Sequence, residues 1–216
     1  METVPFRIAG ILLVAAISSS CRTAAVDQDP PILQPGAPGQ STKVLTTEEA
    51  KALPQPRFTP ADVKFMQGMI GHHAQALEMT DLLKTRSVDP DMKKLAQRIE
   101  LSQADEIKMM KEWLKARGQE VPDDHAHHAH GATLMPGMLT PDEMARLAAA
   151  TGPAFDKLFL EYMIKHHAGA LTMVKELFST PGAGQASEIF GFASDVDADQ
   201  RMEIDRMGAM LRERQK

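Results

Sequence analysis

Histidine is concentrated in three short groups of this sequence. Two adjacent histidines lie in GMIGHHAQALEM, residues 68–79, and two more lie in the near-copy YMIKHHAGALTMV, which begins at Tyr162. The other four lie between the motifs, in HAHHAHGATLMPGM, residues 125–138. Imidazole is a borderline donor suited to copper, and a short histidine-rich tract is typical of metal binding. Metal binding is therefore the first chemistry that the sequence suggests.

Methionine is the second residue type with such chemistry. The chain has 15 methionines in 216 residues, whereas aromatic residues make up 5%. A thioether selects Cu(I) in particular, although methionine also fills gaps in apolar cores. The candidate metal ligands are His72, His73, Met79, His166, His167, Met173, His125, His127, His128, His130, Met135 and Met138.

The two histidines of each motif fall on different parts of a helix. At about 100° per residue, the apolar residues around the first motif share one arc, with His73 near its middle and His72 at its edge, close to Met79. The second motif places His167 and His166 in the same way, with His166 beside Met173. We therefore expect buried His73 and His167, whereas His72 and His166 should be open enough for a metal ion to arrive.

This geometry leads to a specific expectation for copper. His72 and His166, with nearby methionines such as Met79 and Met173, should hold Cu(I). The four histidines of the connecting segment should capture Cu(II) or close over the site.

Polar residues also point inward from a second pair of segments. Gln103 and Glu106 fall within the apolar arc of one segment, and Gln200 and Glu203 within that of the other. We expect these side chains to form an interior polar network with the central histidines. Such a hydrogen-bonded network, with no metal, is an alternative explanation of His73 and His167.

The same residues recur at a nearly constant shift along the chain. Residues 62–83 align with 156–177 at a shift of 94, and residues 99–114 align with 196–211 at a shift of 97. This indicates an internal duplication in which each half is a helical hairpin. Proline near the expected starts supports helices at about 60–84, 90–117, 153–179 and 185–213, with a short one at 141–149. Two hairpins with one core make an all-α four-helix bundle.

The N-terminal residues predict export. Residues 8–17 form an apolar run too short to cross a bilayer, so residues 1–20 are interpreted as a signal peptide. Cys21, the single cysteine, follows three serines and resembles a lipoprotein acylation site, although Ser18 departs from that pattern. We expect a lipid anchor at Cys21, a proline-rich tether over 21–58, and the duplicated bundle over 59–214 with a His/Met-rich connection at 121–140.

The sequence argues against several other partners and activities, although whether the protein is an enzyme stays open. A net charge of -5 and the lack of a basic stripe give no reason to expect nucleic acid, and the lipid would be the only membrane contact. The sequence contains no nucleophile elbow, zinc-protease motif or phosphate-binding loop. No catalytic residue is assigned, and the sequence identifies no protein partner.

The doubled MIxHHxxAxxM pattern carries a family resemblance. With MPGM and FDKLFLEYMIKHH before the second copy, and QADEIKMMKEWL closing the first half, it resembles the domain-of-unknown-function family 305 over about residues 59–214. The resemblance implies a ferritin-like four-helix bundle, usually exported by bacteria, with some relatives that bind copper in the periplasm. One departure from full internal symmetry is Trp113, which is matched by Met210.

Three functions follow as alternatives. The first is copper binding, buffering or resistance at the bacterial envelope, in the periplasm or anchored at Cys21. The second is a di-metal oxidoreductase with iron or manganese, for which the interior offers few carboxylates and no Glu-x-x-His pair. The third is an envelope interaction module without metal, in which the histidines only join the two hairpins.

Overall fold

The computed structural model describes residues 30–34, 41–53, 56–123 and 134–214. They belong to two units, residues 1–54 and 55–216. Within these described ranges, no helix combines the length and the apolar character needed to span a membrane.

The first unit contains short regular elements within the segment expected to be a tether. Strand β1 (Ile32–Gln34) pairs antiparallel with β2 (Lys43–Leu45), and helix α1 (Thr47–Lys51) follows. The helix starts at Thr46 because this residue and Glu49 satisfy each other's backbone N–H groups in a capping box. The expectation of an extended tether over 21–58 missed these elements, since strands of three residues are too short to show an alternating pattern.

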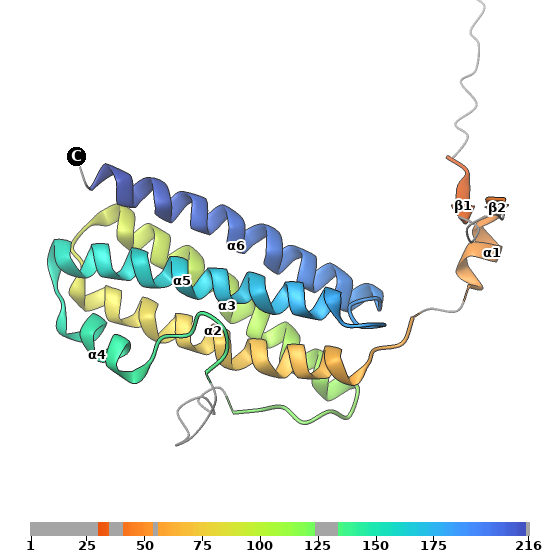
Figure 1. Cartoon of the computed structure of the whole chain (residues 1–216), viewed down its shortest axis with the longest axis horizontal. Coiled ribbons are helices and arrows are strands. Elements are labelled where there is room, and N and C mark those ends of the chain that lie inside the picture. The colour runs from red at the N-terminus through yellow and green to blue at the C-terminus, as the bar shows by residue number, and fades with distance from the viewer. Residues whose placement is uncertain (1–29, 35–40, 54–55, 124–133, 215–216) are drawn as a thin grey trace, which may run out of the picture. The chain divides into compact units, whose positions relative to one another are not determined.

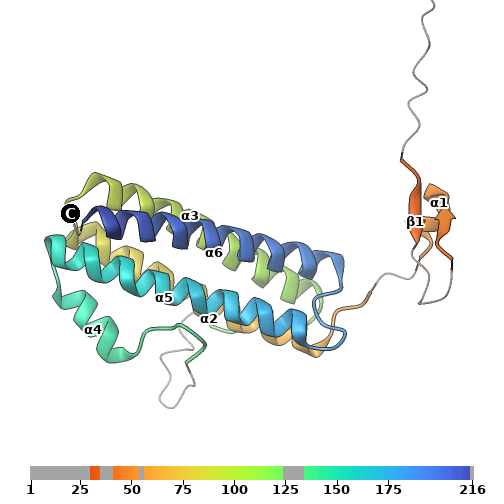
Figure 2. The same ribbon diagram turned by 45° about the horizontal axis from the view of Figure 1, so that its top comes forward.

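The second unit is built from four long helices, which confirms the all-α prediction. They are α2 (Pro60–Arg86), α3 (Pro90–Ala116), α5 (Gly152–Ser179) and α6 (Ser187–Glu213), and they run side by side in Figures 1 and 2. A shorter helix, α4 (Pro141–Ala149), lies in the connection between the two hairpins. The helix ends differ by at most two residues from those expected from the sequence.

Helix starts are defined by side chains that bond the free backbone N–H groups. Thr59 and Asp62 form a capping box at α2, and Asp89 accepts from the first turn of α3. Thr140 and Glu143 form another capping box at α4. A proline stands in the first turn of each of these helices, where its missing N–H costs nothing. These caps fix where α2, α3 and α4 begin, whereas α5 and α6 start without a side-chain cap.

The two hairpins meet along α2 and α5. His72 faces His166, whereas Gly68, one turn earlier on α2, contacts Met173, two turns later on α5, so the two helices are antiparallel. Apolar side chains form two buried clusters, one around Phe65 and Ile70 and the other around Phe155 and Phe159.

Two arginines join the second helices of the hairpins. Arg117 follows the end of α3 and pairs with Glu188 in the first turn of α6. Arg214 follows the end of α6 and pairs with Asp89 at the start of α3. The two ion pairs therefore tie α3 to α6 at both ends.

Candidate metal centre

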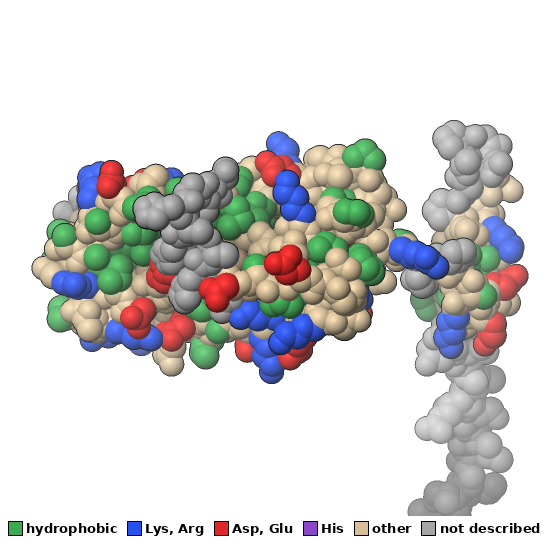
Figure 3. All heavy atoms as spheres, turned by 90° about the horizontal axis from the view of Figure 1, so that it is seen from below, with side chains coloured by type: hydrophobic (Ala, Val, Ile, Leu, Met, Phe, Trp, Pro, Cys, Tyr) green, Lys and Arg blue, Asp and Glu red, His purple; other side chains and the backbone are tan. Residues whose placement is uncertain are grey.

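The two hairpins bring His72 and His166 into direct contact at the α2–α5 interface. Their ring centroids lie 3.9 Å apart, with 37° between the ring planes. Both residues are 0% exposed, so the expectation that they are open to an arriving ion is wrong. Among the described residues, no histidine side chain is visible on the face of the molecule drawn in Figure 3.

A short stretch of chain explains this burial. Residues Met135–Leu139, which we call the strap, lead into α4 and lie against α2 and α5. The carbonyl oxygen of Pro136 lies 3.0 Å from the Nε2 atom of His72. The Gln75 amide donates to the Leu139 carbonyl at 2.9 Å and accepts from the Leu139 N–H at 2.7 Å. Backbone N–H and carbonyl groups of the strap thus find hydrogen-bond partners in side chains of α2.

On the α5 side, the strap makes a glycine-to-glycine contact. Gly137 has a positive φ of 75° and lies against Gly169 of α5. A Cβ atom at Gly169 would stand 1.9 Å from the Pro136 oxygen, which real structures do not tolerate. Backbone therefore packs on backbone here, and only glycine permits so close an approach.

His166 has chemistry suited to a ligand. Neither of its ring nitrogens has a hydrogen-bond partner of good geometry among the described residues, although a backbone interaction with His72 opposes the fall of its pKa. Burial lowers the pKa of His166 well below its usual range, and His72, His167 and His73 lower this pKa further. The imidazole is therefore neutral, and a neutral imidazole offers a nitrogen lone pair to a metal ion. A buried polar group without a partner also costs free energy, which a bound ion would recover.

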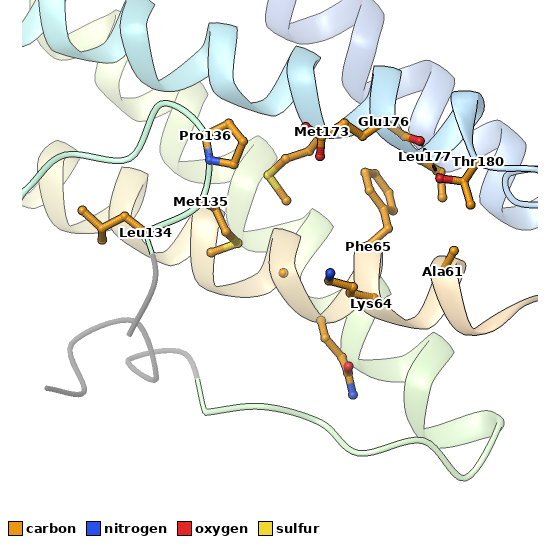
Figure 4. Close-up of a pocket in the computed structure, with 12 residues that line it drawn as sticks. Ala61, Lys64, Phe65, Leu134, Met135, Pro136, Met173, Glu176, Leu177 and Thr180 are labelled. Carbon is orange, nitrogen blue, oxygen red and sulfur yellow. Dashed lines mark hydrogen bonds between the residues drawn. The ribbon is translucent and has the colours of Figure 1, made fainter. Parts of the chain in front are cut away.

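Two thioethers lie one helical turn away, over Gly68. A Cβ atom at Gly68 would be 3.2 Å from the Sδ atom of Met135 and 3.4 Å from the Cε atom of Met173. Both side chains line a pocket of about 770 Å³ between α2, α5 and the strap (Figure 4). Tyr162 holds the equivalent position in the second motif, so the space left by Gly68 has no counterpart there. The pocket gives the two sulfur atoms an open side.

The other two histidines are held by carboxylates. The Nε2 atom of His73 lies 2.5 Å from Oε2 of Glu106, and that of His167 lies 2.6 Å from Oε2 of Glu203. These are two of the partners expected from the sequence for the central histidines. Each ring centroid is 6.2 Å from that of the neighbouring histidine in its motif. The four imidazoles therefore include an inner pair, His72 and His166, and two outer members bonded to carboxylates.

Further polar groups lie near the carboxylates. Asp199 is half-buried, and burial, Glu106 and Glu203 raise its pKa. The side-chain oxygens of Gln103 and Gln200 are buried and have no hydrogen-bond partner among the described residues. Within the described ranges, no three His, Cys, Asp or Glu side chains are grouped so that they could hold a metal ion. This donor set does not match the four carboxylates of a di-iron or di-manganese bundle.

The remaining candidate ligands are not gathered at one point. Met79 packs in the cluster with Phe155 and Phe159, apart from Met173 and from the pocket that Met173 lines. Met138 is a buried residue of the strap. The histidines at 125, 127, 128 and 130, and Cys21, lie outside the described residues.

Reasoning from the sequence missed the residues that position the strap. Gln75 and Gly169 occupy equivalent places in the two motifs, and both contact the strap. The exchange of glutamine for glycine at one position of two otherwise similar motifs was the sequence signal that could have indicated the strap. Gly68, aligned with Tyr162, gave a comparable signal for the pocket.

A family model described as "Domain of unknown function (DUF305)" matches residues 62–211. A DUF305 protein of Streptomyces coelicolor, assigned as secreted, is 31% identical with a TM-score of 0.62, covering 71% of this chain and 93% of that chain. A DUF305 fragment from Deinococcus radiodurans is 33% identical with a TM-score of 0.60, covering 72% and 98%. No protein of curated function matches the chain significantly.

Structures of a protein named CopM are also similar to this chain. Its Cu(II)-bound form is 29% identical with a TM-score of 0.57, covering 70% of this chain and 96% of that chain. Its Cu(I)-bound form is 28% identical with a TM-score of 0.55, covering 73% and 98%. CopM has also been solved with silver bound.

Proposed function

This chain belongs to the DUF305 family, and from that premise we propose that it is an exported copper-binding protein that buffers copper or confers resistance to it. The copper- and silver-bound structures of CopM support soft-metal binding within a similar fold. The similarity to a Streptomyces protein that is assigned as secreted supports export.

One observation carries the choice of site. His166 is fully buried and its ring nitrogens have no hydrogen-bond partner of good geometry among the described residues, while its ring stacks on His72. The thioethers of Met135 and Met173 converge one turn away. Imidazole and thioether together favour Cu(I) over the harder divalent ions, so this donor set fits copper in its reduced state.

The residues divide between binding and support. His72 and His166 would supply nitrogen ligands, and Met135 and Met173 would supply sulfur. Bound here, copper would be kept from water by the strap and the apolar clusters, which is the protection that a storage site provides. Glu106 and Glu203 orient His73 and His167 beside the site through the short hydrogen bonds described above.

The interaction module without metal is supported by a different observation. His73 and His167 already have carboxylate partners, so their burial needs no metal. That explanation does not extend to His166, whose two nitrogens have no partner of good geometry among the described residues. Copper binding therefore also explains the buried nitrogens of His166, which a module without metal does not.

Three elements of the proposal concern residues that the structure does not describe. Residues 1–20 direct export, and Cys21 carries a lipid that anchors the chain to the envelope by way of the segment up to residue 58. The histidines at 125, 127, 128 and 130 capture Cu(II). Mass spectrometry of the protein purified from a bacterial envelope tests the first two, since it reports both the cleavage point and an acylated cysteine.

The test of the copper site is a competition titration with a Cu(I) chelator. The variants are His166→Leu, Met135→Leu with Met173→Leu, and, as a matched control, alanine at the four loop histidines. Wild type and the control should compete equally, whereas the first two variants should lose at least about tenfold in affinity, the equivalent of one ligand interaction of about 1.4 kcal/mol. Circular dichroism of each variant checks that the helices remain. Equal competition by all of them would refute the site.

A further inference from the structure

We propose that the strap, residues Met135–Leu139, is a cover that must lift from α2 and α5 before a soft metal ion reaches the His72–His166 pair. Gln75 and Gly169 are the positioning residues that set how readily it lifts. This inference rests on the proposed function, because it concerns access to the same site.

The His72 and His166 side chains are closed off from solvent. Both imidazoles are 0% exposed, so an ion reaches them only when some part of the protein moves. The helices that carry them have 27 and 28 residues and pack through both apolar clusters. The strap is a short connection between helices, and among the described residues it hydrogen-bonds to α2 at His72 and Gln75. Displacing the strap therefore breaks fewer contacts than separating the helices.

The strap occupies a nitrogen atom that the metal ion needs. With the strap in place, the Nε2 atom of His72 is bonded to the carbonyl oxygen of Pro136. A metal ion bound at this nitrogen would take the place of that carbonyl. The bond between Pro136 and His72 must therefore break before this nitrogen can bind an ion, whereas the bonds from Gln75 to Leu139 can still hold the strap over the bound ion.

The pocket supplies a route. Met135 and Pro136 belong to the strap and also line the pocket, where Met173 faces Met135 across Gly68 (Figure 4). An ion entering the pocket meets thioethers before it meets imidazoles. Binding to Met135 would place it at the edge of the strap that contacts His72.

Two variants loosen the strap without removing a proposed ligand. Gly169→Ala places a methyl group against the Pro136 backbone, so the strap has to shift. Its matched control is Gly191→Ala on α6, where an added Cβ meets no atom within 4 Å. Gln75→Leu removes both bonds to Leu139, and its control is Gln67→Leu, which removes only an exposed bond to the Glu120 carbonyl. If Gly169→Ala fails to fold, Gln75→Leu still tests the proposal.

The experiment uses the full chain with Ag(I) as the probe. Equilibrium titration measures whether Ag(I) binds, stopped-flow transfer to a thiol chelator measures how fast it leaves, and hydrogen exchange follows the Leu139 amide. We expect Gly169→Ala and Gln75→Leu to release Ag(I) about tenfold faster than their controls, which corresponds to the loss of one net hydrogen bond. In wild type, bound Ag(I) should accelerate exchange of the Leu139 amide by a similar factor.

The possible failures are distinguishable. If Ag(I) binds in a His166-dependent manner but release rates match the controls and the Leu139 amide stays protected, the strap is not the cover and the proposed function stands. If wild type binds no Ag(I) at equilibrium, the proposed function fails and this inference fails with it.

Discussion

The two histidine motifs, MIGHHAQALEM on α2 and MIKHHAGALTM on α5, differ where the strap crosses them. Both motifs contain two adjacent histidines. The second histidine of each motif, His73 or His167, is bonded to a glutamate. Gln75 and Gly169 stand at the same position of the motif but do opposite things. Gln75 bonds the strap backbone, while Gly169 leaves room for it.

This difference teaches that the site is asymmetric although its histidines are paired. One strap crosses two similar helices, so each helix needs a different residue beneath it. The same asymmetry leaves Gly68 on α2 where α5 has Tyr162, and a pocket with two thioethers forms on the α2 side. The residues that the two motifs share build the bundle. The residues that differ between the motifs hold the strap and leave space for the pocket.

The largest effect should come from the carboxylates that the two halves share. Glu106→Leu should lower the free energy of unfolding by about 3 kcal/mol, because it leaves the buried His73 ring without its partner. Glu203→Leu should cost about 1–2 kcal/mol, because its side chain is 20% exposed against 10% for Glu106 and water can replace part of the bond. Chemical denaturation measures both, and a larger loss for Glu203→Leu would contradict the ranking.

The next effect concerns the residue that differs between the motifs. Gln75→Leu should cost about 2 kcal/mol, since it leaves the buried Leu139 N–H and carbonyl unsatisfied. Gln67→Leu on the same helix should change the stability by less than about 0.5 kcal/mol, because its bond is exposed. Equal stabilities of the two variants would mean that the strap is not held by Gln75.

A smaller, pH-dependent effect is expected where α4 meets α5. Burial raises the pKa of Glu143, but hydrogen bonds from Lys165 and the Thr140 backbone outweigh burial and hold this pKa below its usual range. The pair, at 2.7 Å, therefore contributes stability that is present above the unfolded pKa of about 4.3 and is lost as pH falls through the folded pKa. Glu143→Gln should cost about 0.5 kcal/mol at neutral pH and nothing in strong acid. Thermal melts across this range test it, with Glu161→Gln, from a more exposed pair, as the control.

The smallest effect concerns α3 and α6. Asp199 aligns with Ser102, which donates a hydrogen bond to Glu106. The raised pKa of Asp199 means that its ionised form is disfavoured in the folded state, a penalty present at neutral pH and absent below the unfolded pKa. Asp199→Ser should therefore raise stability at neutral pH by a few tenths of a kcal/mol. A loss of stability at neutral pH would show that Asp199 makes a favourable contact instead.

The sequence predicted the bundle because its signals are local. Proline and capping residues mark the starts of helices such as α2 and α4, and helical periodicity placed His73 and His167 on the inner face. Both signals depend on residues within a few turns of one another.

The burial of His72 and His166 could not be predicted in that way. It depends on the contact between Pro136 and His72, which are 64 positions apart, and helical periodicity carries no information on such a contact. Periodicity placed these histidines at a helix edge, where a second segment can still cover them. The sequence contained only an indirect sign of the strap, the exchange of Gln75 for Gly169 between the motifs.

X-ray absorption spectroscopy of the Cu(I)-loaded chain tests the copper site most directly, because it identifies the atoms bound to the metal. The proposed site predicts both nitrogen and sulfur neighbours around copper in wild type. Met135→Leu with Met173→Leu should remove the sulfur contribution, and His166→Leu should reduce the nitrogen contribution. A spectrum without sulfur in wild type, or one unchanged in both variants, would place copper elsewhere and contradict the assignment.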